Sequence, residues 1–208
     1  MRRAVAATVI VGVAIGSTSS ASANDISSVQ VAIAMRTCEE AERAGAADKL
    51  HTLELIDGGV QAAEAAVAAD PKDPRAYLAL FCNLEKQSDL AGLSWRVFAR
   101  LQRAKAVIDR AHQLAPKDPD VLTAKGRFVH RLPSVLGGDR AAGLALLRQA
   151  VALDPDHVGA RLALARAMAE DGAPDARAKA YEALAVAKKL GAKREQSEAA
   201  DLLANMSQ

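Results

Sequence analysis

Cys38 and Cys82 are the only cysteines of this 208-residue chain and its clearest candidates for side-chain chemistry. An even pair of cysteines forms a disulfide in many exported proteins. If residues 28–44 and 74–86 are the first helices of successive hairpins, they lie side by side and the two thiols could face each other. The alternative is two free, buried thiols that pack as small apolar groups. Neither cysteine has the paired spacing or basic neighbours that activate a thiol, so we expect no redox catalysis.

The remaining polar residues form no recognisable catalytic or metal-binding pattern. The sequence has no glycine-rich phosphate loop, nucleophile elbow, His-Glu-x-x-His or Cys-x-x-Cys. Glu39 and Glu40 lie within helical reach of Arg36 and Arg43, which favours a solvated helix face over an acid–base pair. The histidines are isolated, with no second ligand at helical spacing: His51, His112, His130 and His157. We therefore expect no enzyme activity, no metal and no cofactor.

Aromatic residues make up only 3% of the chain, so any clustering of them is informative. Trp95 and Phe98 point away from the apolar stripe of a long helix predicted over residues 89–114. They either pack between two helical layers or line the wall of a groove together with Tyr77, Phe81 and Phe128. The second interpretation predicts a site for an apolar or amphiphilic small molecule.

The N-terminus has the three parts of a cleavable secretory signal. A basic start at Arg2 and Arg3 precedes an apolar run over residues 4–15 and a small-residue cleavage site at Ala21-Ser22-Ala23. A membrane anchor would need about 20 apolar residues, more than this run supplies. We predict that residues 1–23 are removed and that residues 24–208 form a periplasmic helical domain with no stable membrane span.

Loss of the signal removes two arginines and leaves 25 basic and 25 acidic side chains. A formal net charge of zero argues against nucleic acid bound through bulk charge. Arg96, Arg103 and Arg110 recur every seven residues on one face of the predicted long helix. That face is either solvated or a basic rim for an acidic partner.

Three similar short motifs, which we call the stop-and-start phrases, mark the helix junctions of a repeated helical architecture. They begin at Asp70-Pro71, Ala115-Pro116 and Asp154-Pro155. The proline stops the incoming helix, and in the first two copies a following Asp-Pro pair caps and starts the next one. The predicted helices span residues 28–44, 48–69, 74–86, 89–114, 119–131, 139–153, 156–170, 175–190 and 193–205.

The helical pattern resembles the tetratricopeptide repeat, in which small and large residues alternate at fixed helix positions. The matching residues are Ala66, Tyr77, Leu80, Ala104, Ile108, Ala111, Gly126, Leu147 and Ala150, whereas Gly59 and Gly143 replace the usual alanine. The turn from Pro133 through Gly137-Gly138 to Asp139 is also similar to that of the periplasmic TRAP-transporter T component. The repeat family implies a stack of helical hairpins, and the T component implies a transporter accessory.

We therefore predict an all-α protein, a right-handed solenoid of tetratricopeptide-like hairpins with residues 193–205 as a C-terminal capping helix. The first functional hypothesis is an exported, non-enzymatic scaffold that binds a protein or peptide partner of the bacterial cell envelope. The second is a periplasmic carrier or transporter accessory that holds an apolar or amphiphilic small molecule in the aromatic-lined pocket.

Overall fold

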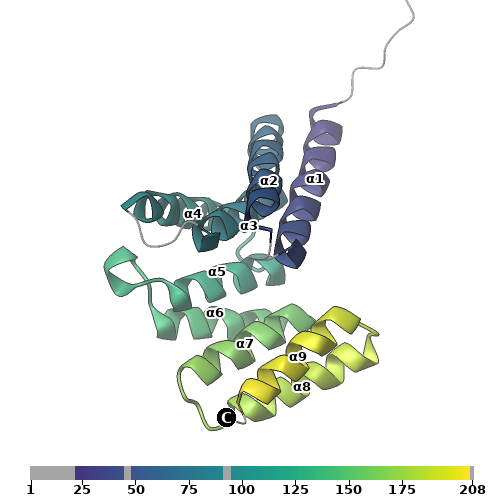
Figure 1. The fold of residues 1–208 in the computed structure, drawn as a ribbon, viewed down its shortest axis with the longest axis vertical. Helices are drawn as coiled ribbons and strands as arrows, with labels where there is room; N and C mark the ends of the chain where they lie inside the picture. Colours follow the sequence, from purple (N-terminus) through teal and green to yellow (C-terminus); the bar gives the residue numbers. More distant parts are fainter. Residues whose placement is uncertain (1–21, 45–47, 91–94, 207–208) are drawn as a thin grey trace, which may run out of the picture.

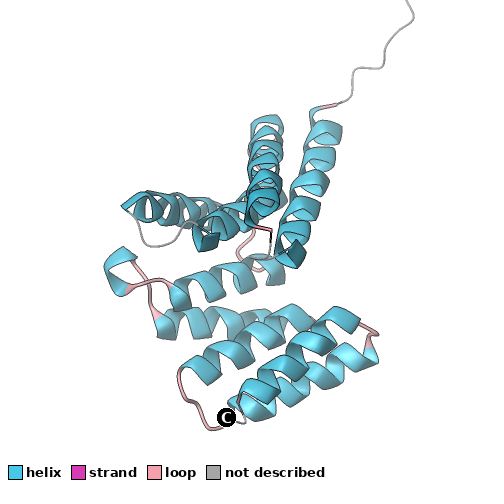
Figure 2. Ribbon diagram, viewed as in Figure 1, coloured by secondary structure: helices cyan, strands magenta, loops and turns pink. Residues whose placement is uncertain are grey.

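The structure, a computed structural model, describes residues 22–44, 48–90 and 95–206. All regular structure in these ranges is helical, as Figure 1 and Figure 2 show. The helices are α1 Ala23–Ala44, α2 Lys49–Ala69, α3 Pro74–Leu90, α4 Trp95–Leu114, α5 Pro119–Arg131, the short 3₁₀ helix η1 Ser134–Leu136, α6 Arg140–Leu153, α7 Val158–Glu170, α8 Ala176–Lys189 and α9 Lys193–Asn205. The predicted all-α class is confirmed. None of the described helices is long and apolar enough to cross a bilayer.

The predicted stop-and-start phrases form the helix junctions. Asp118 lies just before α5, and its side chain accepts hydrogen bonds from the backbone N–H groups of Asp120 and Val121 at 2.9 and 3.2 Å. Pro119 is the first residue of that helix, where its missing N–H leaves no hydrogen bond unmade. The third phrase has no second proline, and there the imidazole of His157 caps α7 instead.

Three predicted helix boundaries are wrong: the end at residue 86, where α3 continues to Leu90, and the starts of two other helices. The helix expected over residues 89–114 begins at Trp95, because Asp89 and Leu90 belong to α3 and residues 91–94 lie outside the described ranges. The first helix begins at Ala23 rather than at residue 28. In the full-length chain Ser22 and Asp25 explain this earlier start, because each side chain bonds the other residue's backbone N–H at 3.2 Å, which is a capping box. Cleavage after Ala23, as predicted, would remove Ser22 and with it this box.

The helices pack as hairpins stacked on one another. Each odd-numbered helix from α1 to α7 packs against the helix that follows it, and α9 covers the last hairpin as the predicted cap (Figure 1). Contacts also join α1 to α3, α5 to α7 and α7 to α9. The odd-numbered helices therefore share one side of the stack, and we call the surface that they form the inner face.

Glycine lets α5 and α6 approach backbone to backbone. A Cβ atom on Gly143 would lie 2.7 Å from the carbonyl oxygen of Gly126 and 2.7 Å from the backbone nitrogen of His130. Both obstacles belong to helix backbones, which cannot rotate away as a side chain could. Gly143 thus replaces the alanine typical of the repeat because this crossing has no room for a methyl group.

The segment between α5 and α6 folds back on the end of α5. The helix ends at Arg131, ahead of Pro133, and Gly137 adopts a left-handed conformation with φ of 86°. The N–H of Asp139 donates to the carbonyl of Val129 at 3.0 Å, and its carboxylate accepts from the N–H of Ala142 at 2.9 Å. This local geometry confirms the predicted turn, while the similarity to the TRAP-transporter T component stays a prediction.

Cys38 and Cys82 form a disulfide that ties α1 to α3, with their Cα atoms 6.2 Å apart. The bridge borders a core that runs from α1 to α5 and includes Ile56, Phe81 and Ile108. Of the two structural alternatives for these cysteines, the structure therefore has the bridged one. The bridge links the first helices of the first two hairpins, which lie side by side as the sequence predicted.

Candidate functional site

The predicted aromatic residues whose side chains the structure describes lie in different surroundings. Phe81 and Phe128 are buried and meet edge to face, with ring centroids 5.3 Å apart, so they join α3 to α5 inside the core. The Tyr77 hydroxyl donates to the carbonyl of Pro71 at 3.1 Å, in the turn just before α3. Phe98 on α4 is 52% exposed, and the side chain of Trp95 lies outside the described part of the structure.

The hollows beside these aromatics are small and separate. Phe128 borders one of about 150 Å³ together with Leu101 and Leu132, whereas Phe81 borders another of about 240 Å³. Sites for drug-sized ligands usually measure roughly 300–1,000 Å³. Phe81 and Phe128 therefore border different hollows in the described part of the structure, and the aromatic-lined pocket stays a prediction.

A charged hollow lies on the inner face, between the first and last helices of the chain. It measures about 280 Å³ and is lined by residues of α1, α3, α5, α7 and α9. Its cationic side chains are Lys86, Arg127, Arg131, Arg166 and Arg194, and its acidic ones are Glu42, Glu195 and Glu198. The hollow therefore carries more positive than negative side chains, although the chain as a whole is nearly neutral.

Glu42 is the central acceptor of this charged hollow. Its carboxylate on α1 lies 3.1 Å from the Lys86 Nζ atom on α3 and also forms an ion pair with Arg194 on α9. Burial alone would raise the pKa of Glu42, but Lys86 and Arg194 together hold it below its ordinary value. This cluster connects residues 152 positions apart, so the first and last helices meet across the inner face.

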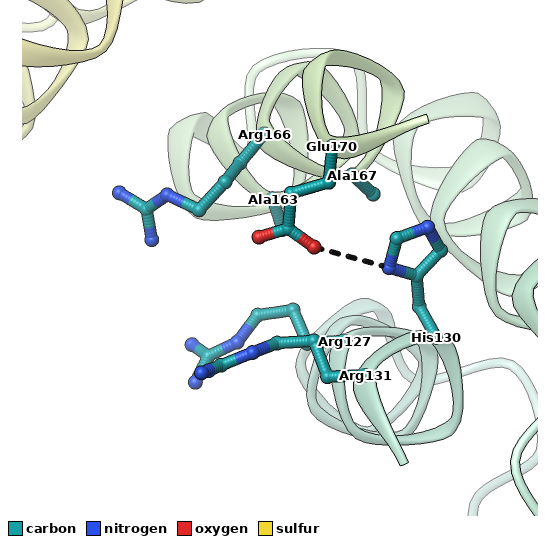
Figure 3. A pocket seen from close by; sticks show the side chains of 7 residues that line it. All are labelled: Arg127, His130, Arg131, Ala163, Arg166, Ala167 and Glu170. Carbon is teal, nitrogen blue, oxygen red and sulfur yellow. Dashed lines mark ion pairs between the residues drawn. The ribbon is translucent and has the colours of Figure 1, made fainter. Parts of the chain in front are cut away.

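The arginines of α5 and α7 extend this positive surface. Figure 3 shows Arg127, Arg131 and Arg166 with their guanidinium groups on the same side, pointing away from His130. Arg127 pairs with Glu85 at 3.1 Å. Arg131 and Arg166 are exposed, and neither has an ion pair or hydrogen bond with any residue that the structure describes.

Two of the histidines have structural roles that the sequence did not reveal. His130 is buried between two carboxylates, with its Nε2 3.1 Å from Asp171 and its Nδ1 3.4 Å from Glu170, the second of which Figure 3 shows. The Nε2 of His157 donates to Asp120 at 2.8 Å, while its Nδ1 accepts from the N–H of Ala160. The Asp120 carboxylate raises the pKa of His157, and the imidazole lowers the pKa of Asp120.

Among the residues that the structure describes, neither histidine belongs to a group of three or more His, Cys, Asp or Glu side chains placed to hold a metal ion. His130 and His157 instead join neighbouring helices through carboxylates, Asp171 following α7 and Asp120 in α5. Their contacts therefore account for both rings as structural links between α5 and α7.

The inner-face arginines are the feature that sequence reasoning missed. The seven-residue series predicted a different set, but Arg103 forms an ion pair with Glu64 on α2, and the Arg96 side chain lies outside the described part. Arg127 and Arg131 are four residues apart on one helix, which places them on the same face. That spacing was visible in the sequence, but nothing in it showed that this face would meet α7 and α9.

Comparison with solved structures identifies the fold. The TPR protein TTC0263 from Thermus thermophilus is similar with a TM-score of 0.60 and 26% identity, over 73% of this chain and 74% of that protein. A mutant of the O-GlcNAc transferase of Thermobaculum terrenum is similar with a TM-score of 0.50 and 19% identity, over 78% of this chain and 26% of the transferase. This chain has the tetratricopeptide-repeat fold. No family model and no curated protein sequence matches it.

The tetratricopeptide repeats of this chain are longer than the usual 34 residues for identifiable reasons. Pro71 and Pro116 are 45 residues apart, and that interval contains the extension of α3 to Leu90. Pro116 and Pro155 are 39 residues apart, and the added residues form η1 and its flanking turn. Both additions lie at the α3–α4 and α5–α6 connections, so the stacking of the helices is kept.

Proposed function

We propose that the protein is a non-enzymatic scaffold of the bacterial cell envelope that binds a protein or peptide partner on its inner face. The charged hollow shared by α1, α3, α5, α7 and α9 carries this proposal. Tetratricopeptide stacks present extended surfaces built from successive helices, which suit a peptide or protein better than an enclosed small molecule. Phe81 and Phe128 border separate small hollows, which gives the carrier hypothesis less support.

The location in the cell envelope is supported by the N-terminal pattern and by the disulfide. Residues 1–23 have the composition of a secretory signal, although residues 1–21 lie outside the described structure. A disulfide between Cys38 and Cys82 persists most readily in an oxidising compartment such as the periplasm.

Site-specific photocrosslinking in the native host tests the partner surface. A photoreactive phenylalanine replaces Ala124, which borders the inner face on α5, or replaces Ala106 on α4 or Ala145 on α6 as matched controls on exposed helix positions. We expect a discrete protein adduct from Ala124 and none from the two controls. Equal adducts from all three positions, or adducts from the controls alone, would contradict a partner site on the inner face.

A further inference from the structure

The inner-face hollow has cationic side chains that its own carboxylates do not neutralise. Glu42 forms ion pairs with both Lys86 and Arg194, and the Glu198 carboxylate lies 3.0 Å from the Arg194 Nε atom. Arg131 and Arg166 line the same hollow without a partner in the described chain. The surface therefore has unused capacity for negatively charged groups.

The two free arginines are arranged for one ligand to reach both. Arg131 comes from α5 and Arg166 from α7, and both also line a smaller neighbouring hollow with Glu170, where Figure 3 shows their side chains extending to the same side. An anion that contacts both guanidinium groups would offset the repulsion between their like charges. The planar guanidinium group has donors spaced to bind a carboxylate through two hydrogen bonds.

The protein itself shows which group this surface accepts. The Glu42 carboxylate reaches across from α1 and occupies Arg194, which lines the same hollow as the two free arginines. We infer that Arg131, Arg166 and Arg194 bind an acidic segment of the partner, and that Glu42 holds Arg194 in the unbound protein as an internal competitor. This inference rests on the proposed function, because it names the chemistry of the partner at the same face.

An acidic peptide fits this hollow better than a dense polyanion does. Glu195 and Glu198 line it beside the arginines, and they would repel a chain that carries one charge at every step. A peptide with spaced carboxylates can meet the arginines and avoid the glutamates. The nearly neutral charge of the whole protein likewise offers no broad positive field for nucleic acid.

Fluorescence anisotropy with a labelled peptide of alternating glutamate and serine tests the site. The counterpart with glutamine in place of glutamate is the peptide control. The double substitution Arg131→Gln/Arg166→Gln should weaken binding of the acidic peptide by about tenfold or more, because each lost arginine removes a charged hydrogen bond. Arg148→Gln, which removes an exposed arginine on α6, should leave the affinity unchanged.

The competitor role of Glu42 has its own test. Glu42→Gln should tighten binding of the acidic peptide severalfold, because the Arg194 Nη2 and the Lys86 Nζ then lose their internal carboxylate and can bind the peptide. In an Arg194→Gln background the same change should give a smaller gain, from Lys86 alone, which separates competition at Arg194 from the release of Lys86. Circular dichroism of each variant checks that the helices are intact.

Each remaining outcome overturns a defined part of the inference. Equal affinity for the glutamate and glutamine peptides, or equal losses in Arg148→Gln and the double variant, overturns the arginine site. Binding of heparin without binding of the acidic peptide also overturns it. An unchanged affinity in Glu42→Gln overturns the competitor role. If Ala124 still crosslinks a partner in these cases, the proposed function survives and only this inference fails.

Discussion

Removal of the disulfide between α1 and α3 should destabilise the protein by an amount that its loop length predicts. The bridge joins residues 44 positions apart, so it closes a loop of about 45 residues in the unfolded chain. On the chain-entropy relation this constraint contributes about 4 kcal/mol to the free energy of unfolding at 25 °C. For a chain of this size the loss lowers the melting temperature by roughly 8–16 °C.

Urea unfolding followed by far-ultraviolet circular dichroism measures this effect. The comparison uses the oxidised protein, the protein in dithiothreitol and the double variant Cys38→Ala/Cys82→Ala. The reduced protein and the double variant should unfold at similar, lower urea concentrations. Hydrogen exchange should show the first loss of protection in α1, because the bridge is the covalent tie between α1 and the second hairpin.

Two results would contradict the stabilising role of the disulfide. Thiol titration of the denatured, unreduced protein should find no free thiol, and two free thiols would mean that Cys38 and Cys82 only pack together. Equal urea midpoints for the oxidised protein and the double variant would show that the bridge forms but constrains little. Single alanine variants control for the packing of each side chain, because both lack the bridge and each keeps one thiol.

Three further predictions concern the α5–α6 contact, the cap of α7 and the N-terminus. Gly143→Ala should lower the free energy of unfolding, measured by urea unfolding, by roughly 1–3 kcal/mol through overpacking. Gly58→Ala in α2 should raise it by up to about 1 kcal/mol, because the added methyl group has nothing within 4 Å and alanine favours the helix. The pKa of His157 is raised, so its pair with Asp120 should stabilise the fold below pH 6.5 and lose this contribution as the pH rises through the raised value. The pKa of Asp120 is lowered, so its contribution should hold above pH 3.8 and disappear as the pH falls through the lowered value. In pH-resolved melting curves Asp120→Asn should remove this dependence and reduce that of His157, on which Asp154 also acts. Intact mass of protein from the periplasmic fraction should correspond to a chain that begins at Asn24, and a full-length mass would contradict export with cleavage.

The helix junctions were predictable because their causes are local. Asp118 and Pro119 are adjacent in sequence, and the cap that they form depends on no distant residue. The end of α3 was not predictable for the opposite reason. Ser88 and Asp89 are residue types that often begin helices, but the Ser88 hydroxyl bonds the carbonyl of Leu84 at 2.9 Å inside the helix instead.

The candidate site was less predictable than the fold because it depends on how hairpins stack. Sequence spacing shows that Arg127 and Arg131 share a face of α5, but not which helix that face meets. Arg166 and Arg194 join them only after α7 and α9 are placed. The surroundings of Phe81 depend on stacking in the same way, because its burial against Phe128 is decided by the packing of α3 on α5.

The ion pair between Glu42 and Arg194 links binding to the shape of the stack. If the inference holds, a partner carboxylate that bonds the Arg194 Nη2 displaces Glu42 and breaks the ion pair that joins α9 to α1. An exposed ion pair contributes little stability, typically about 0–1 kcal/mol, so its loss would not unfold the protein. A partner would therefore replace this ion pair at little cost in stability, while the Arg194 Nε atom keeps its ion pair with Glu198. A buried, fully paired carboxylate at position 42 would instead be costly to displace and would weaken binding of the partner.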